Sequence, residues 1–185
     1  MSGVRGRGRK GIRAAAQNAA PMVVLGIDPG TAHTGFGVVA RRRAALVALD
    51  GGVIRTESAL PLELRLAEIH RQVGELIDAY EPQALAVEDV FFGVNVRTAF
   101  AVGQARGAAL LAAGQRRLPC SSYTPQQVKG AVCGSGRAEK GQVQRMVQQL
   151  LALPEPPSPD HAADALAVAV CHVNRAPLAA ALARA

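Results

Sequence analysis

The sequence predicts an α/β domain in which a mixed β-sheet carries helices on its faces. Three observations lead to this fold class. The chain has 185 residues, of which 49% are hydrophobic, so it can bury one core of useful size. Its apolar runs come in the order of three strands, a helix, a strand, a helix, a strand and further helices. A meander followed by alternating strands and helices gives a mixed sheet covered by helices.

The first half of the domain is expected to be a strand meander followed by a helix. The run MVVLGID is continuously apolar and β-branched, as in a buried central strand. Residues 35–40 and 44–54 are predicted to be the next two strands, with the arginine triplet 41–43 as a solvated turn between them. Apolar residues then recur at helical spacing over residues 62–80, and Pro82 ends that helix.

The second half is expected to alternate between strands and helices. The last helix has Ser158 as a suitable N-cap and Pro159 at its first position, and it is predicted to run to about Asn174. The elements before it are a strand at 84–88, a helix at 97–116, a strand at 118–123, a short helical turn opened by Thr124-Pro125 and a helix around 143–151.

The net charge of +7 is concentrated in two segments of the chain. The first thirteen residues carry five basic side chains and no acid. Residues 91–150 carry eight basic side chains against the single acid Glu139. A basic balance inside the domain, and not only in its tail, indicates a polyanionic partner such as nucleic acid.

Composition also predicts the boundaries of the domain. Residues 1–21 begin with a Gly/Arg-rich stretch that has no apolar period, so we expect a disordered basic tail. Residues 22–174 are the expected folded domain, and residues 175–185 a C-terminal extension. No apolar run reaches 18 residues and no convincing signal peptide is present. The three cysteines form no CxxC pair, which fits a reducing cytoplasm.

Three acidic residues stand where a charge is costly to bury. Asp28 ends the first apolar strand, Glu88 ends the fourth, and Asp164 lies in the apolar last helix, three residues after His161. An unpaired buried carboxylate is unfavourable, and a bound cation removes that cost. Ligands collect at the carboxyl ends of the strands in open α/β sheets. Carboxylates with one imidazole would bind a hard divalent ion.

Each of these residues also has a structural interpretation. Asp28 could cap the turn at Pro29-Gly30, and Glu88 could be a charge at the end of a strand. His161 could simply lie in the first helical turn, and Asp164 could pair with an arginine. The four together, at two strand ends and on one helix face, favour a metal site over four unrelated roles.

Three later motifs give the sequence a specific resemblance. They are AVEDVFFGVNVRTAFAVGQARGAAL at 86–110, YTPQQVKGAVCGSGRAEKGQVQRMV at 123–147 and DHAADALAVAVCH at 160–172. Together with GIDPGTAHTGFGVV at 26–39, they resemble the RuvC family of Holliday junction resolvases from about residue 22 to 174. The resemblance implies a ribonuclease H-like fold with a mixed five-stranded sheet flanked by helices. It also implies an endodeoxyribonuclease that resolves four-way junctions, in recombination and repair, by paired symmetric nicks that leave 5′ phosphates.

The resemblance implies a catalytic and metal-binding tetrad. Its members are Asp28, Glu88, His161 and Asp164, which would hold two divalent ions per subunit, Mg²⁺ or Mn²⁺, with Asp28 between them. The third position is often aspartate in the family and is histidine in some members. Asp160 is the neighbouring rival ligand, and the three-residue spacing from His161 to Asp164 favours the histidine.

The family also implies contacts with DNA and with other proteins. Lys129 and Lys140 match basic residues that face DNA, and Phe91 matches an aromatic residue that meets unpaired bases, while Phe92 is expected in the core. Two symmetric cuts require a homodimer, for which the small-residue helix at 97–116 is the candidate interface. A branch-migration complex of the RuvA and RuvB type is the other implied partner.

Two other functions remain open at this point. The Asp-Pro-Gly-Thr turn at 28–31 also occurs in actin-like ATPases, but 185 residues hold only one of the two lobes that such enzymes need. A noncatalytic junction-binding module would keep the fold and lose the reaction. The carboxylates at every expected metal position argue against such a module.

Overall fold

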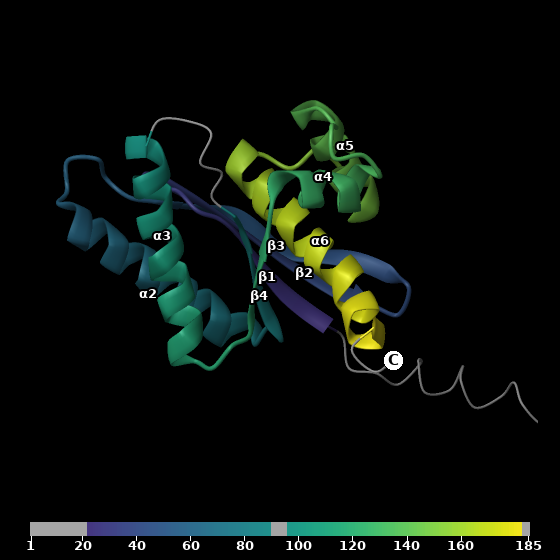
Figure 1. Cartoon of the computed structure of the whole chain (residues 1–185), viewed down its shortest axis with the longest axis horizontal. Coiled ribbons are helices and arrows are strands. Elements are labelled where there is room, and N and C mark those ends of the chain that lie inside the picture. Colours follow the sequence, from purple (N-terminus) through teal and green to yellow (C-terminus); the bar gives the residue numbers. More distant parts are fainter. Residues whose placement is uncertain (1–21, 90–95, 183–185) are drawn as a thin grey trace, which may run out of the picture.

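The computed structural model describes residues 22–89 and 96–182, with side chains described as far as residue 176. Its centre is a five-stranded sheet in the order β3-β2-β1-β4-β5 (Figure 1). β1 pairs antiparallel with β2 and parallel with β4, so the sheet is mixed and the predicted fold class is confirmed. The strands are β1 (Met22–Asp28), β2 (His33–Arg42), β3 (Ala45–Arg55), β4 (Ala84–Glu88) and β5 (Cys120–Tyr123).

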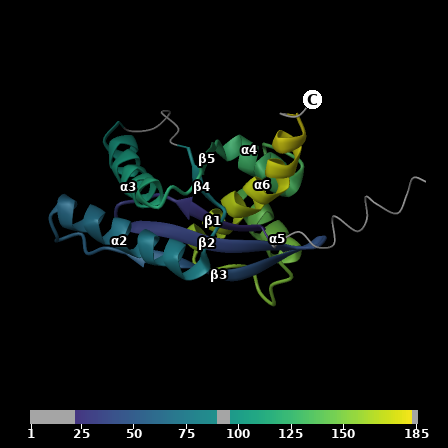
Figure 2. The same ribbon diagram turned by 90° about the horizontal axis from the view of Figure 1, so that it is seen from below.

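Helices cover both faces of the sheet (Figure 2). One apolar core joins the sheet to α2 and α3, and a second joins its other face to α4, α5 and α6. In the part of the chain that the structure describes, no helix combines the length and apolarity needed to cross a bilayer. The helices are α2 (Leu62–Tyr80), α3 (Val96–Gln115), α4 (Pro125–Cys133), α5 (Lys140–Leu150) and α6 (Asp160–Leu182).

The continuous apolar run of β1 is explained by these two covered faces. Successive side chains of a strand point to opposite faces of its sheet. Val24 packs in the core formed with α4, α5 and α6, whereas Leu25 and Ile27 pack in the core formed with α2 and α3. All three side chains are fully buried. The same alternation puts Gly26 and Asp28 on the face that α6 covers.

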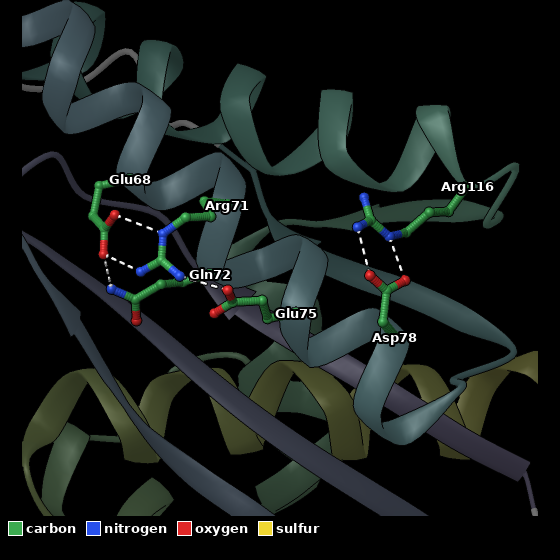
Figure 3. A network of polar contacts seen from close by, with 6 residues as sticks. All are labelled: Glu68, Arg71, Gln72, Glu75, Asp78 and Arg116. Atoms are coloured by element: carbon green, nitrogen blue, oxygen red, sulfur yellow. Dashed lines mark hydrogen bonds and ion pairs between the residues drawn. The ribbon is translucent and has the colours of Figure 1, made fainter.

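Polar contacts join α2 to α3 on the other side of the sheet (Figure 3). Arg116, just after α3, donates to both carboxylate oxygens of Asp78 in α2, at 2.6 and 2.7 Å. Its guanidinium lies over Gly74, where an added Cβ would come within 2.7 Å of Nη2. Arg71 bridges two glutamates one turn away on α2 itself. The Arg116 contact fixes the C-terminal end of α3 against α2.

Most of the expected elements are present, and their ends show where the prediction was wrong. The helix at 62–80 and the strand at 84–88 have the expected bounds. The arginine triplet is not a solvated turn throughout, because β2 includes Arg41 and its Nη2 donates to the carbonyl of Val173 at 3.1 Å. The turn falls at Arg43 instead, which has a φ of 56°.

Two helices extend beyond their predicted limits. The turn expected at Thr124-Pro125 is the start of a nine-residue helix, which Thr124 and Gln127 close with a reciprocal capping box. α6 begins at Asp160, one residue later than predicted, and the carbonyl of Pro159 accepts the hydrogen bonds of its first turn. α6 also continues past Asn174, to Leu182.

Candidate active site

Two neighbouring parallel strands end in carboxylates at the same edge of the sheet. Asp28 is the last residue of β1 and Glu88 the last of β4, directly after the paired residues Ile27 and Val87. Ala86 packs in the core under α6, so strand alternation puts Glu88 on that face, as it does Asp28. The Asp28 side chain is only 15% exposed. Both acids therefore point toward α6 from a largely buried edge.

The N-terminal part of α6 crosses this edge and adds His161 and Asp164. The helix lies directly on the strands because β1 and β2 have glycine where the backbones meet. A Cβ on Gly35 would come within 2.0 Å of the carbonyl oxygen of His161, and one on Gly26 within 2.2 Å of that of Ala165. Any larger residue at these two positions would push α6 away from the sheet.

His161 is joined to Asp28 by a hydrogen bond. The distance from His161 Nδ1 to Asp28 Oδ2 is 2.7 Å. When Asp28 is ionised it can only accept, so Nδ1–H of His161 is then the donor, and a neutral ring with this tautomer has its lone pair on Nε2. One residue expected in the metal site thus fixes the tautomer of another.

Lys140, at the start of α5, lies between two acids of α6. Its Nζ is 3.3 Å from Asp164 Oδ2 and 3.0 Å from Asp160 Oδ2. Gln144 donates to the other oxygen of Asp160 at 2.9 Å. The exposed Asp160 side chain is thus committed to α5. This arrangement favours His161, which contacts Asp28, as the fourth member of the cluster.

Burial and neighbouring charges raise the pKa of two carboxyls of the cluster, Glu88 and Asp28. Burial raises the pKa of Glu88 to about 7, and the charges of Asp28 and Asp164 add to the rise. Burial also raises the pKa of Asp28, and Asp164 adds to that rise, while the hydrogen bond from His161 lowers it. The raised pKa values of Asp28 and Glu88 mean that ionising these two carboxyls is costly, and a bound cation would offset that cost.

A pocket of about 190 Å³ opens beside the cluster. Lys129 of α4 and Lys140 of α5 both reach it, so the two lysines expected to face DNA lie beside the acids. The charges of both lysines lower the pKa of Glu88, although less than burial raises it. The full lining is Glu88, Pro125, Val128, Lys129, Lys140, Val143, Asp164 and Ala167.

The donor set fits a divalent cation by its chemistry. Carboxylates and imidazole are ligand types that divalent cations such as Mg²⁺ or Mn²⁺ accept, and the raised pKa values of Asp28 and Glu88 reflect the positive charge that the cluster needs. Among residues 22–89 and 96–182, no three acidic, histidine or cysteine side chains have the geometry of a formed metal site. A positive charge beside the cluster is the ammonium of Lys140, whose Nζ is 3.3 Å from Asp164 Oδ2.

The structure brings together all but one of the predicted site residues. Phe91, expected to meet unpaired bases, lies outside the described residues. His33 was not among the predicted site residues, yet its ring stacks on that of His161 with centroids 5.7 Å apart and planes 10° from parallel. The signal was a histidine five residues after Asp28, at the start of a strand antiparallel to β1.

A mixed five-stranded sheet in this order, with acids at the ends of its parallel strands and on the helix across them, defines the ribonuclease H-like class of nucleases. The comparisons with known proteins identify the family within that class. The family model described as "Crossover junction endodeoxyribonuclease RuvC" matches residues 24–172. The chain belongs to this RuvC family, as its motifs predicted.

Relatives and solved structures agree with the family. The chain is 52% identical over 153 residues to the crossover junction endodeoxyribonuclease RuvC of Desulforamulus reducens, covering 83% of this chain and 94% of that protein. It is 54% identical over 156 residues to that of Moorella thermoacetica, covering 84% and 93%.

Two solved structures bear on the fold. The structure of Thermus thermophilus RuvC in complex with a Holliday junction substrate matches with a TM-score of 0.82 at 43% identity, covering 85% of this chain and 96% of that one. The yeast mitochondrial Holliday junction resolvase matches with a TM-score of 0.57 at 14% identity, over 90% and 87% of the two chains, and supports the fold alone.

Proposed function

We propose that this chain is a structure-selective endodeoxyribonuclease that resolves four-way DNA junctions in recombination and repair. It would do so by paired, symmetric nicks that leave 5′ phosphates. The observation that carries the proposal is the cluster of Asp28, Glu88 and Asp164, in which the pKa of Glu88 is raised to about 7. The crossover junction endodeoxyribonucleases to which the chain is about half identical support the same reaction.

The reaction we propose depends on two divalent metal ions per subunit, Mg²⁺ or Mn²⁺. Asp28, Glu88, Asp164 and the imidazole of His161 are the groups that would hold them. When bound, such ions supply a nucleophilic water and stabilise the leaving 3′ oxygen. Asp28 has a second task, since its carboxylate accepts from His161 and fixes the tautomer of that ring.

Lys129, Lys140 and Phe91 are the groups that we expect to contact the junction. The two lysines border the acidic pocket from α4 and α5, where they can pair with phosphates beside the bond to be cut. Segment 91–150, which contains all three residues, has eight basic side chains against one acid. This charge distribution gives nonspecific affinity that falls with added salt.

We infer a homodimer because the described part of the chain offers one such site and a junction needs two cuts. The candidate interface is the exposed side of α3, where Phe100 and Leu111 are 68% and 56% exposed. A groove of about 440 Å³ between α2 and α3 is lined by Leu66, Ala108 and Leu111 among others. A second copy is the occupant that the two-fold symmetry of the substrate favours.

The remaining parts of the proposal concern the cell. A branch-migration complex of the RuvA and RuvB type would present the junction to the dimer. We infer that the enzyme acts in the cytoplasm, which agrees with three cysteines that form no disulfide.

Cleavage of a synthetic mobile four-way junction tests the proposal. We compare the wild type, Asp28→Asn and Asp50→Asn in Mg²⁺ and in Mn²⁺. Asp50 is a control, because it lies on β3 and accepts from the hydroxyl of Tyr80, a bond that the amide can keep. We expect paired nicks that ligase can seal, lost only in Asp28→Asn, whose junction binding survives.

Other results of this assay would contradict the proposal. Junction binding without cleavage by the wild type in either metal would favour a noncatalytic module. Equal cleavage by Asp28→Asn would mean that the active site lies elsewhere. Because an imidazole among the ligands favours softer metals, activity in Mn²⁺ should at least equal that in Mg²⁺. Markedly higher activity in saturating Mg²⁺ would count against His161 as a ligand.

A further inference from the structure

His33 is a histidine beside the acidic cluster that none of the predicted roles uses. It is the first residue of β2, and it lies on the same strand face as Gly35 and Gly37, whose added Cβ atoms would meet α6. From this face its ring reaches the ring of His161, with centroids 5.7 Å apart and planes 10° from parallel. This separation is within the range of offset-stacked aromatic pairs.

The backbone under His33 is held independently of the stack. Thr34, the next residue, is fully buried, and its hydroxyl donates to the carbonyl of Gly30 at 2.7 Å. His33 itself pairs with Arg55 across the β2–β3 ladder. Gly35 lies directly against the carbonyl of His161. Sheet and helix therefore fix where the His33 side chain begins, and its exposed ring extends from there to the ring of His161.

His161 needs such a support because little else in the described structure restrains its ring. Its side chain is 46% exposed, in the first turn of α6. One hydrogen bond, from Nδ1 to Asp28, fixes one edge of the ring. A single bond of this kind leaves the ring plane free to tilt about it. The flat face of His33 opposes that tilt.

We propose that His33 is a positioning residue that holds the imidazole of His161 in the plane of its hydrogen bond to Asp28. The inference rests on the proposed nuclease function. The support acts through the shape of the His33 ring and not through its nitrogens. Its effect is to keep Nδ1–H of His161 on Asp28 and so to fix the orientation of the imidazole beside the acidic cluster.

Two substitutions separate the shape of the ring from its nitrogens. His33→Phe keeps a flat ring and removes both nitrogens, whereas His33→Ala removes the ring. We expect His33→Ala to lower the rate of junction cleavage about threefold to tenfold, the range that corresponds to one aromatic pair. Cleavage by His33→Phe should stay near the wild-type rate. Junction affinity should be equal in all three proteins.

A second readout needs no metal and no DNA. The chain has four histidines, so the ring N–H signals of protein with ¹⁵N-labelled histidine can be assigned one at a time. In EDTA, we expect the Nδ1–H signal of His161 in the wild type and in His33→Phe. In His33→Ala this signal should broaden or vanish through faster exchange with water. A wild type that fails to cleave would refute the nuclease proposal and leave this readout intact.

Three results would overturn the role of His33. Equal loss of activity in His33→Phe and His33→Ala would mean that its nitrogens act directly. An unchanged His161 signal and an unchanged rate in His33→Ala would mean that the stack does nothing. If His33→Ala unfolds, His33→Leu takes its place, and a leucine variant equal to the phenylalanine variant in both readouts would exclude a need for a flat ring.

Discussion

Glu88→Gln should stabilise the metal-free protein at alkaline pH while it abolishes cleavage. Glu88 ends β4 with its carboxyl largely removed from water, near the charges of Asp28 and Asp164. These effects raise its pKa from 4.5 to about 7. An ionised carboxylate at this position opposes folding, and glutamine has the same shape without the charge.

The size and sign of the effect follow from proton linkage. Below pH 4.5 the carboxyl is protonated in both states and costs no stability. Between pH 4.5 and about 7 the unfolded chain loses the proton while the folded chain keeps it, so stability falls as the pH rises. Above pH 7 the full cost applies, and at about 1.4 kcal/mol per pKa unit it is about 3 kcal/mol. The pKa of Asp28 is also raised, so its ionisation likewise lowers the stability of the folded protein as the pH rises.

Urea unfolding in EDTA at pH 4.5, 6 and 8 measures this cost. The two proteins should be nearly equal at pH 4.5, and at pH 8 Glu88→Gln should be the more stable by about 2 to 3 kcal/mol. Glu57→Gln, a change in an exposed loop, is the matched control and should follow the wild type. Saturating Mg²⁺ should stabilise the wild type at pH 8 and Glu88→Gln much less.

The reasoning would be refuted by a wild type whose metal-free stability rises from pH 5 to 8. A Glu88→Gln variant that is no more stable than the wild type at pH 8 would refute it equally. Either result would mean that the folded protein compensates the charge of Glu88 without a metal ion.

Three further substitutions test the geometry of the site and the dimer. Gly35→Ala puts a Cβ within 2.0 Å of the carbonyl oxygen of His161, so it should lower the free energy of unfolding by about 1–3 kcal/mol or more and weaken cleavage. An unchanged melting temperature would contradict the close packing of α6 on β2. Leu111→Glu puts a charge on the proposed interface and should give a monomer in analytical ultracentrifugation that makes unpaired nicks, whereas a stable dimer would move the interface elsewhere. Asp160→Ala should keep cleavage within about fivefold of the wild type, since only its exposed contacts with Lys140 and Gln144 are lost, and a loss as deep as that of Asp28→Asn would make Asp160 a ligand.

The sheet and most of its helices could be predicted because their signals are local. The spacing of apolar residues defined the helix at 62–80 to the residue, and the run ALAVE did the same for β4. The ends of α4 and α6 were harder to predict from the sequence. The capping box of Thr124 and Gln127 is visible in the sequence, but how far α4 continues depends on its packing of Val128 and Val132 against the core.

The acids of the site could be predicted because each breaks an apolar pattern, but their contacts could not. No local sequence pattern predicts that the carbonyl of His161 packs against Gly35, because the two residues are far apart in the chain. The same holds for the stack of His33 on His161 and for the commitment of Asp160 to α5. The alternation of side chains along β2 puts His33 on the same face as Gly35. That this is also the face of Asp28 follows only from the register of β1 and β2, in which Asp28 pairs with Gly35.

Lys140 links the charge of the site to the charge of the substrate. Its ammonium lies 3.3 Å from Asp164 Oδ2 and lowers the pKa of Glu88 in the acidic cluster. A divalent ion bound by Asp164 would compete with the ammonium for the same carboxylate, so the metal and Lys140 are alternative partners of that acid. Once displaced from Asp164, the lysine keeps Asp160 as a partner, and that hydrogen bond raises its pKa by more than burial lowers it, so the lysine keeps its charge. Under the proposed function, the cation that completes the acidic site therefore also frees a positive charge at the pocket edge, where a phosphate of the junction would be bound.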